Sequence, residues 1–119
     1  MTYEYKAELI RVVDGDTIRL RLYKDVDVGF YITQTTSAEM NFRLMRVDTP
    51  EVRGIEKEAG LVVKAYVEEY LNNAVSLRAV TYKPDKYGRW LVELYVTTPD
   101  GEINLSDHLV ETGRATIYK

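Results

Sequence analysis

Residue types that build many common sites are missing or scarce in this sequence. It contains no cysteine, which excludes disulfide bonds and thiolate metal sites. The single histidine, His108, makes a histidine-based zinc site or a histidine-containing catalytic triad implausible. Any metal ion would therefore have to be held by oxygen atoms, which favours a hard cation such as calcium or magnesium.

Long apolar runs are also missing. No stretch approaches the roughly 20 apolar residues that a membrane-spanning helix needs, so no membrane partner is expected. Residues 1–6 lack the apolar region of a signal peptide. We therefore expect no export signal in this chain and favour a cytoplasmic location.

The residues that are present fit one domain of ordinary size. The chain has 119 residues, of which 45% are hydrophobic and 29% are charged, enough for a real core and a solvated surface. Its formal net charge of −3 argues against indiscriminate polyanion binding but leaves room for a local basic groove. Ten tyrosines fit either packing in sheets or stacking on nucleobases.

Apolar residues alternate along several stretches, and this period of two predicts β-strands. The expected strands are 3–13, 17–23, 40–47, 75–82 and 90–97. Residues 24–34 alternate again and either extend the second strand past a bend or form a strand of their own, whereas the polar segment 35–39 is expected to be a loop. Asp14-Gly15-Asp16 predicts a tight turn between the first two strands.

Two helices are predicted. Apolar residues at spacings of three and four give 56–73 one apolar stripe, and Asn104 is placed to cap a short helix that ends near Val110. Strands, a long helix, further strands and a short helix, in that order, fit an α+β, mainly β fold. We expect a five-stranded Greek-key barrel of the OB type that spans 1–119 as a single domain, with the long helix after the third strand.

Four carboxylates lie in two places that a small barrel could bring together. Asp14 and Asp16 flank a turn glycine, an arrangement that also suits a hairpin turn whose acids only aid solubility. Asp48 and Glu51 flank a Thr-Pro pair where the central strand should end. That pattern also suits a strand end followed by a helix start, although strand ends are common places for functional sites.

Two arginines occupy positions that require a structural or functional explanation. Arg43 sits in a strand otherwise rich in apolar residues, where it could extend to solvent, pair with an acid or bind a phosphate with its planar fork. Arg89 follows a glycine at the start of a strand, which also suits an ordinary charged hairpin loop. Acids for a hard cation and arginines for a phosphate together describe phosphodiester hydrolysis, in which Glu51 could activate or orient a water.

The spacing of Arg43 and Asp48 constrains the backbone between them. Arg43 and Asp48 are five residues apart, so in a regular strand their side chains would point to opposite faces. For both to serve one phosphate, the strand must bulge or end before Asp48. Pro50 makes an early end natural.

Three motifs in order resemble those of the staphylococcal nuclease-like (thermonuclease) family. Val12–Thr17 matches its Asp-Gly-Asp-Thr motif, and Phe42–Leu44 with Val47–Glu51 matches its Arg…Asp-Thr-Pro-Glu motif. Asp85–Arg89 matches its Asp-Lys-Tyr-Gly-Arg loop, and Asn104–Ala115 is similar to its last helix and turn. The resemblance therefore covers nearly the whole chain.

This resemblance implies a calcium-dependent nuclease that cleaves DNA and RNA, with Ca²⁺ as its cofactor. The roles it implies are calcium binding by Asp16, Asp48 and the backbone carbonyl of Thr49, water activation or orientation by Glu51, and contacts to the scissile phosphate by Arg43 and Arg89. Lys86 and Tyr87 would contact a neighbouring phosphate, and Tyr118 would contact a nucleotide. The expected substrate is single-stranded or flexible DNA or RNA, and no obligate protein partner is expected.

Two features depart from the family's best-known pattern. Residues 24–40 form a longer connection, similar to an insertion in bacterial and phage relatives, and are expected to project as a hairpin over the substrate groove. The chain is acidic where the archetype is basic, which argues against tight, salt-resistant binding of long nucleic acid. The alternative function is a non-catalytic nucleic-acid- or protein-binding module, although such domains typically lose the acids or arginines that this chain keeps.

Overall fold

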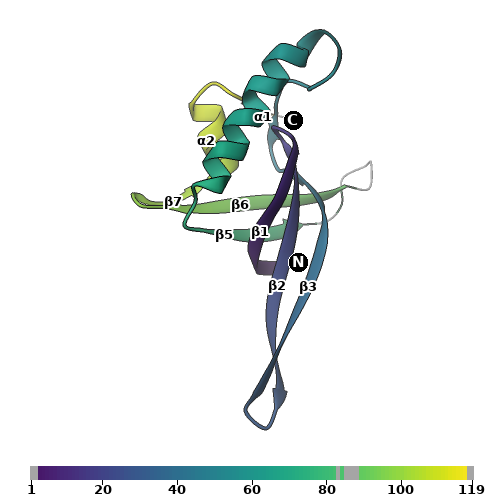
Figure 1. Cartoon of the computed structure of the whole chain (residues 1–119), viewed down its shortest axis with the longest axis vertical. Coiled ribbons are helices and arrows are strands. Elements are labelled where there is room, and N and C mark those ends of the chain that lie inside the picture. Colours follow the sequence, from purple (N-terminus) through teal and green to yellow (C-terminus); the bar gives the residue numbers. More distant parts are fainter. Residues whose placement is uncertain (1–2, 83, 85–88, 118–119) are drawn as a thin grey trace.

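The computed structural model describes residues 3–82, 84 and 89–117. In chain order its elements are β1 (Tyr3–Asp14), β2 (Thr17–Gly29), β3 (Ile32–Leu44), β4 (Val47–Asp48), a 3-10 turn (Gly54–Glu56), α1 (Lys57–Asn72), β5 (Ser76–Tyr82), β6 (Trp90–Thr98), β7 (Gly101–Asn104), α2 (Leu105–Glu111) and β8 (Thr116–Ile117). Both helices lie toward one end of the molecule, and the β2–β3 hairpin extends to the other end (Figure 1).

Five of these strands close into a barrel in the order β3-β2-β1-β5-β6. Neighbours within that order pair antiparallel, and β6 closes the barrel by pairing parallel with β3, from Phe42↔Trp90 to Leu44↔Val92. β7 continues the sheet beyond β6. This architecture confirms the predicted α+β, mainly β fold with an OB-type barrel and a long helix after the third strand.

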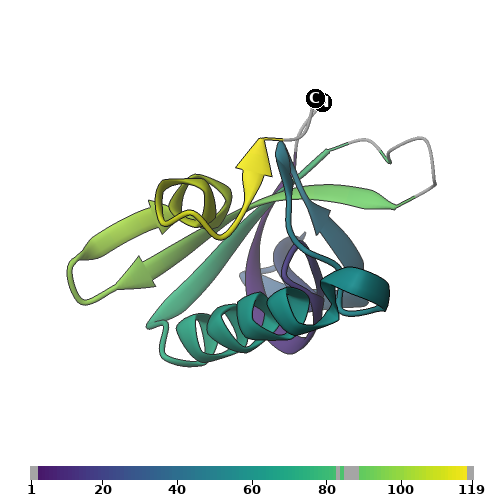
Figure 2. The same ribbon diagram turned by 90° about the horizontal axis from the view of Figure 1, so that it is seen from above.

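The barrel core comes from the inward-facing residues of the strands and from one stripe of α1. Ile18 and Leu20 of β2 and Phe42 of β3 are fully or almost fully buried. Val63 and Val67 of α1, four residues apart and therefore on one face of the helix, are buried against the same core. The view from above shows α1 running across this end of the barrel, with α2 at its side (Figure 2).

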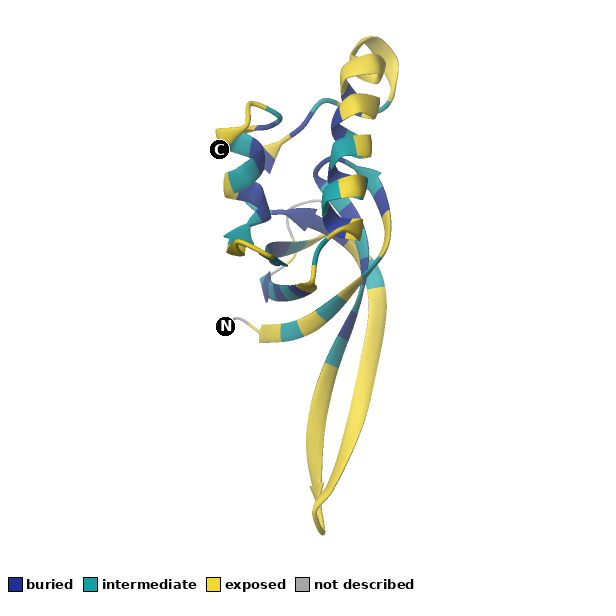
Figure 3. Ribbon diagram, turned by 60° about the vertical axis from the view of Figure 1, so that its left-hand side comes forward, coloured by how far each residue is buried: buried dark blue, intermediate teal, exposed yellow. Residues whose placement is uncertain are grey.

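The β2–β3 hairpin pairs continuously from Thr17↔Arg43 at the barrel to Gly29↔Ile32 at its tip. Residues 24–39, called the arm here, are exposed along their whole length, as the yellow ribbon in Figure 3 shows. The arm confirms the prediction that the long connection after the second strand forms a projecting hairpin.

The loop predicted for 35–39 is wrong, because this segment belongs to β3 and pairs with β2 from Thr35↔Asp25 to Glu39↔Arg21. The arm is exposed on both faces. In 35–39 the residues on both faces are small or polar, so this part of the arm lacks the alternation of apolar and polar residues by which strands are predicted.

The tip of the arm combines unusual backbone with unusual exposure. Phe30 and Tyr31 adopt positive φ angles of 57° and 63°, a conformation that bulky residues rarely take. Their relative exposures are 92% and 107%, so neither ring packs against this chain. The sequence carries no Asn-Gly or Asp-Gly pair at this turn, the usual choice for such angles.

Both predicted helices are confirmed. α1 spans Lys57–Asn72, and α2 begins after Asn104, whose Oδ1 accepts a hydrogen bond from the Asp107 backbone N–H at 3.1 Å. The short strands β4, β7 and β8 were not predicted, because stretches of two to four residues are too short to show alternation. Neither of the two helices described here is long and apolar enough to cross a bilayer.

Candidate functional site

A tight turn ends the central strand of the site. β3 ends at Leu44 and is followed by a turn in which Arg46 has a positive φ of 69°. The expectation that the strand ends before Asp48 is confirmed. The turn brings Asp48 to the side on which Arg43 lies, so that Arg43 Nη2 is 3.4 Å from Asp48 Oδ1.

Arg43 reaches into the site from the barrel wall and is itself only 6% exposed. Its Nη1 donates a hydrogen bond to the Val47 carbonyl at 3.1 Å, and its Nη2 lies 3.6 Å from Asp16 Oδ2. The carboxylates of Asp16 and Asp48 therefore offset the charge of a buried guanidinium. The carbonyl contact also fixes the direction in which the planar fork points.

Asp16 lies on the turn between β1 and β2 and ties that turn to the chain around Asp48. Its Oδ2 accepts a hydrogen bond from the backbone N–H of Thr49 at 3.2 Å, across a sequence separation of 33 residues. Its backbone carbonyl accepts a hydrogen bond from the Leu44 N–H at 2.8 Å. These two bonds explain how motifs from different strands come to form one site.

The two acids differ in their exposure. The side chain of Asp48 is 55% exposed, whereas that of Asp16 is 11% exposed. Partial burial, followed by the negative charge of Asp16, raises the pKa of Asp48, and the charge of Arg43 opposes this shift. Carboxylates that converge in this way concentrate negative charge, which a bound cation would neutralise.

A pocket of about 200 Å³ collects most of the predicted site residues. The residues that line it are Asp14, Asp16, Thr17, Arg43, Asp48, Thr49, Pro50, Glu51 and Arg89. The structure thus brings together the predicted calcium ligands, the predicted water-activating acid and both arginines. Lys86, Tyr87 and Tyr118, the predicted substrate-binding residues, lie outside the described residues.

The arm does not cover this pocket. Thr17 and Arg43 lie at the barrel end of the β2–β3 hairpin, and the tip of the arm lies at its other end. For this pocket, the expectation that the hairpin projects over the substrate groove is therefore wrong, since the arm points away from it (Figure 1).

Two residues that line the pocket each carry a buried oxygen atom that has no hydrogen-bond partner among the described residues. These atoms are Asp14 Oδ1 and Thr49 Oγ1. Buried polar atoms are normally satisfied, so unsatisfied oxygens beside two carboxylates fit a site that takes a hard cation. No three acidic or histidine side chains of the described chain form a metal cluster by themselves, so the fit rests on two carboxylates and on oxygens of Asp14 and Thr49.

Two glycines allow the site to pack closely against α1. Sequence analysis placed Gly15 in a tight turn but did not predict this contact, and it did not identify Gly60. A Cβ atom on Gly15 would lie 2.6 Å from Val63 Cγ1 and 2.9 Å from Thr49 Oγ1. A Cβ atom on Gly60 of α1 would overlap the backbone carbonyl of Glu51. A glycine inside an apolar helix stripe, which costs about 1 kcal/mol relative to alanine, was the signal available for Gly60.

Arg46 supports the turn from outside the pocket. Its Nη2 lies 2.9 Å from Glu93 Oε2 and 3.0 Å from Asp107 Oδ1, and Asn104 Nδ2 donates to the same Glu93 oxygen at 2.6 Å. This network joins the turn to β6 and to the start of α2. The role of Arg46 in it was not predicted, because its partners lie far away in the sequence.

Comparisons with known proteins agree with this geometry. Residues 41–119 match the model of the family described as staphylococcal nuclease homologue. The chain is 26% identical over 136 residues to uncharacterized protein MJ1439 of Methanocaldococcus jannaschii, covering 96% of this chain and 59% of that protein. It is 29% identical over 122 residues to endonuclease Htp3 of Saprolegnia parasitica, covering 96% of this chain and 56% of that protein.

The chain therefore spans somewhat more than half the length of the curated relatives that it matches. The family match covers more than half of this chain and includes the end of β3, the turn after it, Asp48 and Glu51, whereas Asp14 and Asp16 lie outside it. The protein belongs to the staphylococcal nuclease homologue family.

Proposed function

We propose that this protein is a calcium-dependent nuclease that hydrolyses phosphodiester bonds of single-stranded or flexible DNA or RNA. One observation carries the proposal: Arg43, Arg89, Asp16, Asp48 and Glu51 line a single pocket at the end of β3. Groups that bind a cation and groups that bind a phosphate lie within reach of each other there. Family membership and the endonuclease name of one relative support the same activity.

The calcium ion would be held by the carboxylates of Asp16 and Asp48 and by the backbone carbonyl of Thr49. Calcium accepts carboxylate, carbonyl and water oxygens in flexible geometry, which suits a partly open pocket with one buried and one half-exposed acid. When bound, the ion supplies positive charge that polarises a phosphoryl oxygen. The unsatisfied oxygens of Asp14 and Thr49 support a polar ligand beside these acids.

The arginines would bind the scissile phosphate from two sides of the barrel closure. Arg43 projects from β3 and is oriented by the Val47 carbonyl, whereas Arg89 directly precedes β6 and is exposed. A guanidinium can bind two phosphate oxygens at once and can stabilise charge that grows in the transition state. We assign this role to both residues.

Glu51 would activate or orient the attacking water. It is exposed, it lines the pocket, and its backbone packs against Gly60. A carboxylate not used by the metal ion can accept a proton from water or hold the water in line with the phosphorus atom. We further propose, from the family motif, that Lys86 and Tyr87 contact a neighbouring phosphate and that Tyr118 contacts a nucleotide.

A cleavage assay tests the proposal. The protein is incubated with single-stranded DNA and with RNA, in calcium and in excess chelator, next to Asp100→Ala, which changes an exposed acid on a distant turn. We expect cleavage of at least one polymer in calcium, loss of cleavage in chelator, and normal activity of Asp100→Ala. Cleavage that persists in chelator removes the calcium assignment, and binding without cleavage by folded protein identifies the non-catalytic module instead.

A further inference from the structure

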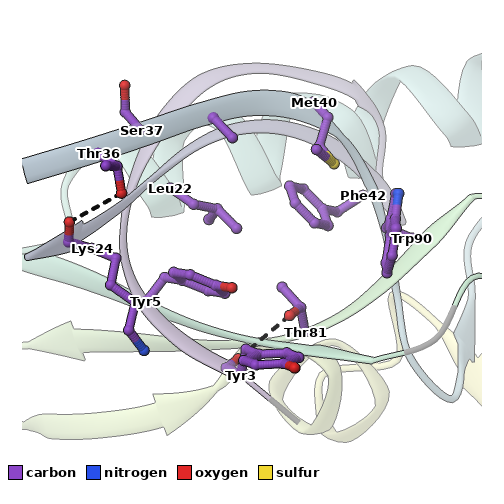
Figure 4. A pocket seen from close by; sticks show the side chains of 11 residues that line it. Tyr3, Tyr5, Leu22, Lys24, Thr36, Ser37, Met40, Phe42, Thr81 and Trp90 are labelled. Carbon is purple, nitrogen blue, oxygen red and sulfur yellow. Dashed lines mark hydrogen bonds between the residues drawn. The ribbon is translucent and has the colours of Figure 1, made fainter. Parts of the chain in front are cut away.

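A second pocket, of about 390 Å³, opens between the base of the arm and the strands β1, β5 and β6. Figure 4 shows the side chains that line it, which come from both sides of the barrel opening. They include Tyr3, Tyr5, Lys24, Phe42 and Trp90. Its volume lies within the range of about 300–1,000 Å³ that is typical of pockets for small organic groups.

This pocket, called the aromatic pocket here, lies back to back with the pocket of Arg43 and Arg89. Phe42 lines the aromatic pocket and its neighbour Arg43 lines the site, as expected because consecutive strand residues face opposite sides. Trp90, the first residue of β6, lines the aromatic pocket, and Arg89 directly before it lines the site. Phe42 and Trp90 are themselves partners in the β3–β6 pairing, so the two pockets share one short wall.

The chemistry of the aromatic pocket suits a flat, aromatic group carried on an anionic chain. Tyr3 and Trp90 are 49% and 43% exposed, so a ligand can reach their rings. Among the described residues that line the pocket, Lys24 is the one charged residue, and none carries a carboxylate. Lys24 Nζ lies 5.4 Å from the centre of the Tyr5 ring, which places positive charge beside this aromatic side chain.

We propose that the aromatic pocket binds a nucleobase of the nucleic acid strand whose phosphate occupies the site of Arg43 and Arg89. The strand would pass over the edge formed by Arg89 and Trp90, and one base beyond that edge would stack on Trp90 and Tyr3. Stacking on aromatic side chains is tolerant of base identity and contributes about 1–3 kcal/mol per base. This inference rests on the proposed function, because it takes nucleic acid as the substrate.

Trp90 supplies the measurement, because it is the single tryptophan of the chain and lines the aromatic pocket. Its fluorescence is followed in chelator while single-stranded DNA of about ten nucleotides is added, a length within the span that one OB-type domain covers. The matched probe is an abasic oligonucleotide of equal length, which keeps the phosphates but has no bases. We expect quenching by the first and none by the second.

Variants locate the contact. Tyr3→Ala should weaken binding of the normal oligonucleotide about five- to a hundredfold, the effect of losing one stacked base, and Tyr3→Phe should restore it. Tyr31→Ala removes an equally accessible tyrosine at the tip of the arm and should leave binding unchanged. Thermal unfolding of each variant verifies that it is folded. Equal quenching by the abasic oligonucleotide, or unchanged affinity of folded Tyr3→Ala, overturns the proposal.

Two further outcomes separate this inference from its alternatives. Base-dependent quenching without calcium-dependent cleavage would support the nucleobase pocket and contradict the nuclease proposal. Calcium-dependent cleavage without base-dependent quenching would support the nuclease proposal and contradict the nucleobase pocket. The apolar tip of a second copy's arm is the other candidate occupant. A shift of Trp90 emission with protein concentration, a dimer in sedimentation, and loss of both in Tyr31→Ala would assign the pocket to the arm and overturn the nucleobase proposal.

Discussion

The backbone of Glu51 packs directly onto Gly60 of α1, so closely that a methyl group on Gly60 would overlap the Glu51 carbonyl. α1 therefore fixes the position of the acid that we propose acts on water. The residue that permits this contact has no functional group of its own, and its importance is visible only in three dimensions.

Gly60→Ala should separate activity from helix stability. Alanine favours the helix by about 1 kcal/mol, but its methyl group must push the Glu51 segment away. A displacement of about 1 Å can lower a rate roughly a hundredfold. Cleavage rates measured beside Val62→Ala, an exposed change on the same helix, test this, and equal rates for the two variants would contradict it.

Arg43→Ala and Arg89→Ala should lose similar activity but differ in stability. Each removes a proposed phosphate contact, and losing one such transition-state donor costs on the order of 10²–10³ in rate. Arg43 is buried and bonded to the Val47 carbonyl, so its loss should also destabilise the fold by about 1–3 kcal/mol. Arg89 is exposed, and its loss should change stability by less than about 0.5 kcal/mol.

Cleavage kinetics and urea unfolding of both arginine variants make this comparison. Near-normal cleavage by either variant would remove that residue from the site. An Arg43→Ala protein as stable as the parent would show that the buried contacts of Arg43 contribute little to folding.

Asp16→Asn should weaken calcium binding while keeping the turn intact. The amide oxygen can still accept the hydrogen bond from the Thr49 N–H, but the charge is gone. Calcium should raise the unfolding temperature of the parent protein, because a ligand that binds only the folded state stabilises it, and should raise that of Asp16→Asn far less. Calorimetric titration with calcium gives the affinities, with Asp100→Ala as the control, and equal affinities would take Asp16 off the ligand set.

His108 should make stability fall on acidification. Its ring stacks 4.6 Å from the Tyr70 ring, and Tyr66 Oη lies 2.6 Å from His108 Nε2. Burial, followed by the charge of Arg114, lowers the pKa of His108, while Glu111 opposes this. The contribution of neutral His108 to the free energy of unfolding is therefore fully present above the unfolded pKa of about 6.5. It is lost as pH falls toward the lower pKa of the folded state.

His108→Gln removes the titrating group and should flatten this part of the profile. Urea unfolding of both proteins across the acidic range measures the effect. A parent whose stability rises as pH falls from about 6.5 would have the opposite sign and would contradict the assignment.

Residues that readily adopt positive φ angles should stabilise the tip of the arm. Phe30 and Tyr31 both hold positive φ, at a cost of order 1 kcal/mol or more for each. The double change Phe30→Asn and Tyr31→Gly should raise the unfolding temperature without altering cleavage, since the arm points away from the site. A lower unfolding temperature would mean that the aromatic tip makes stabilising contacts in solution.

Sequence analysis predicted the barrel because most strands bury one face and so alternate, and it predicted the helices from a stripe and a cap. It was wrong about 35–39, where both faces meet solvent and alternation has no cause. The motifs predicted that Arg43, Asp16 and Asp48 come together. They could not reveal that Gly15 and Gly60 permit close packing, because the neighbours that require a glycine there lie far away in the sequence.

The parallel closure of the barrel has a consequence for motion. β3 and β6 are joined by three residue pairs, whereas β2 and β3 pair along most of their length. Among the strand pairings of the barrel, as far as the structure describes them, this seam has the fewest residue pairs, so its amide protons should exchange through local opening well below the free energy of global unfolding. Arg43 lies on β3 and Arg89 directly precedes β6, so a phosphate bound by both arginines would link the two strands across the seam. Slower hydrogen exchange at 42–44 and 90–92 would then report substrate binding.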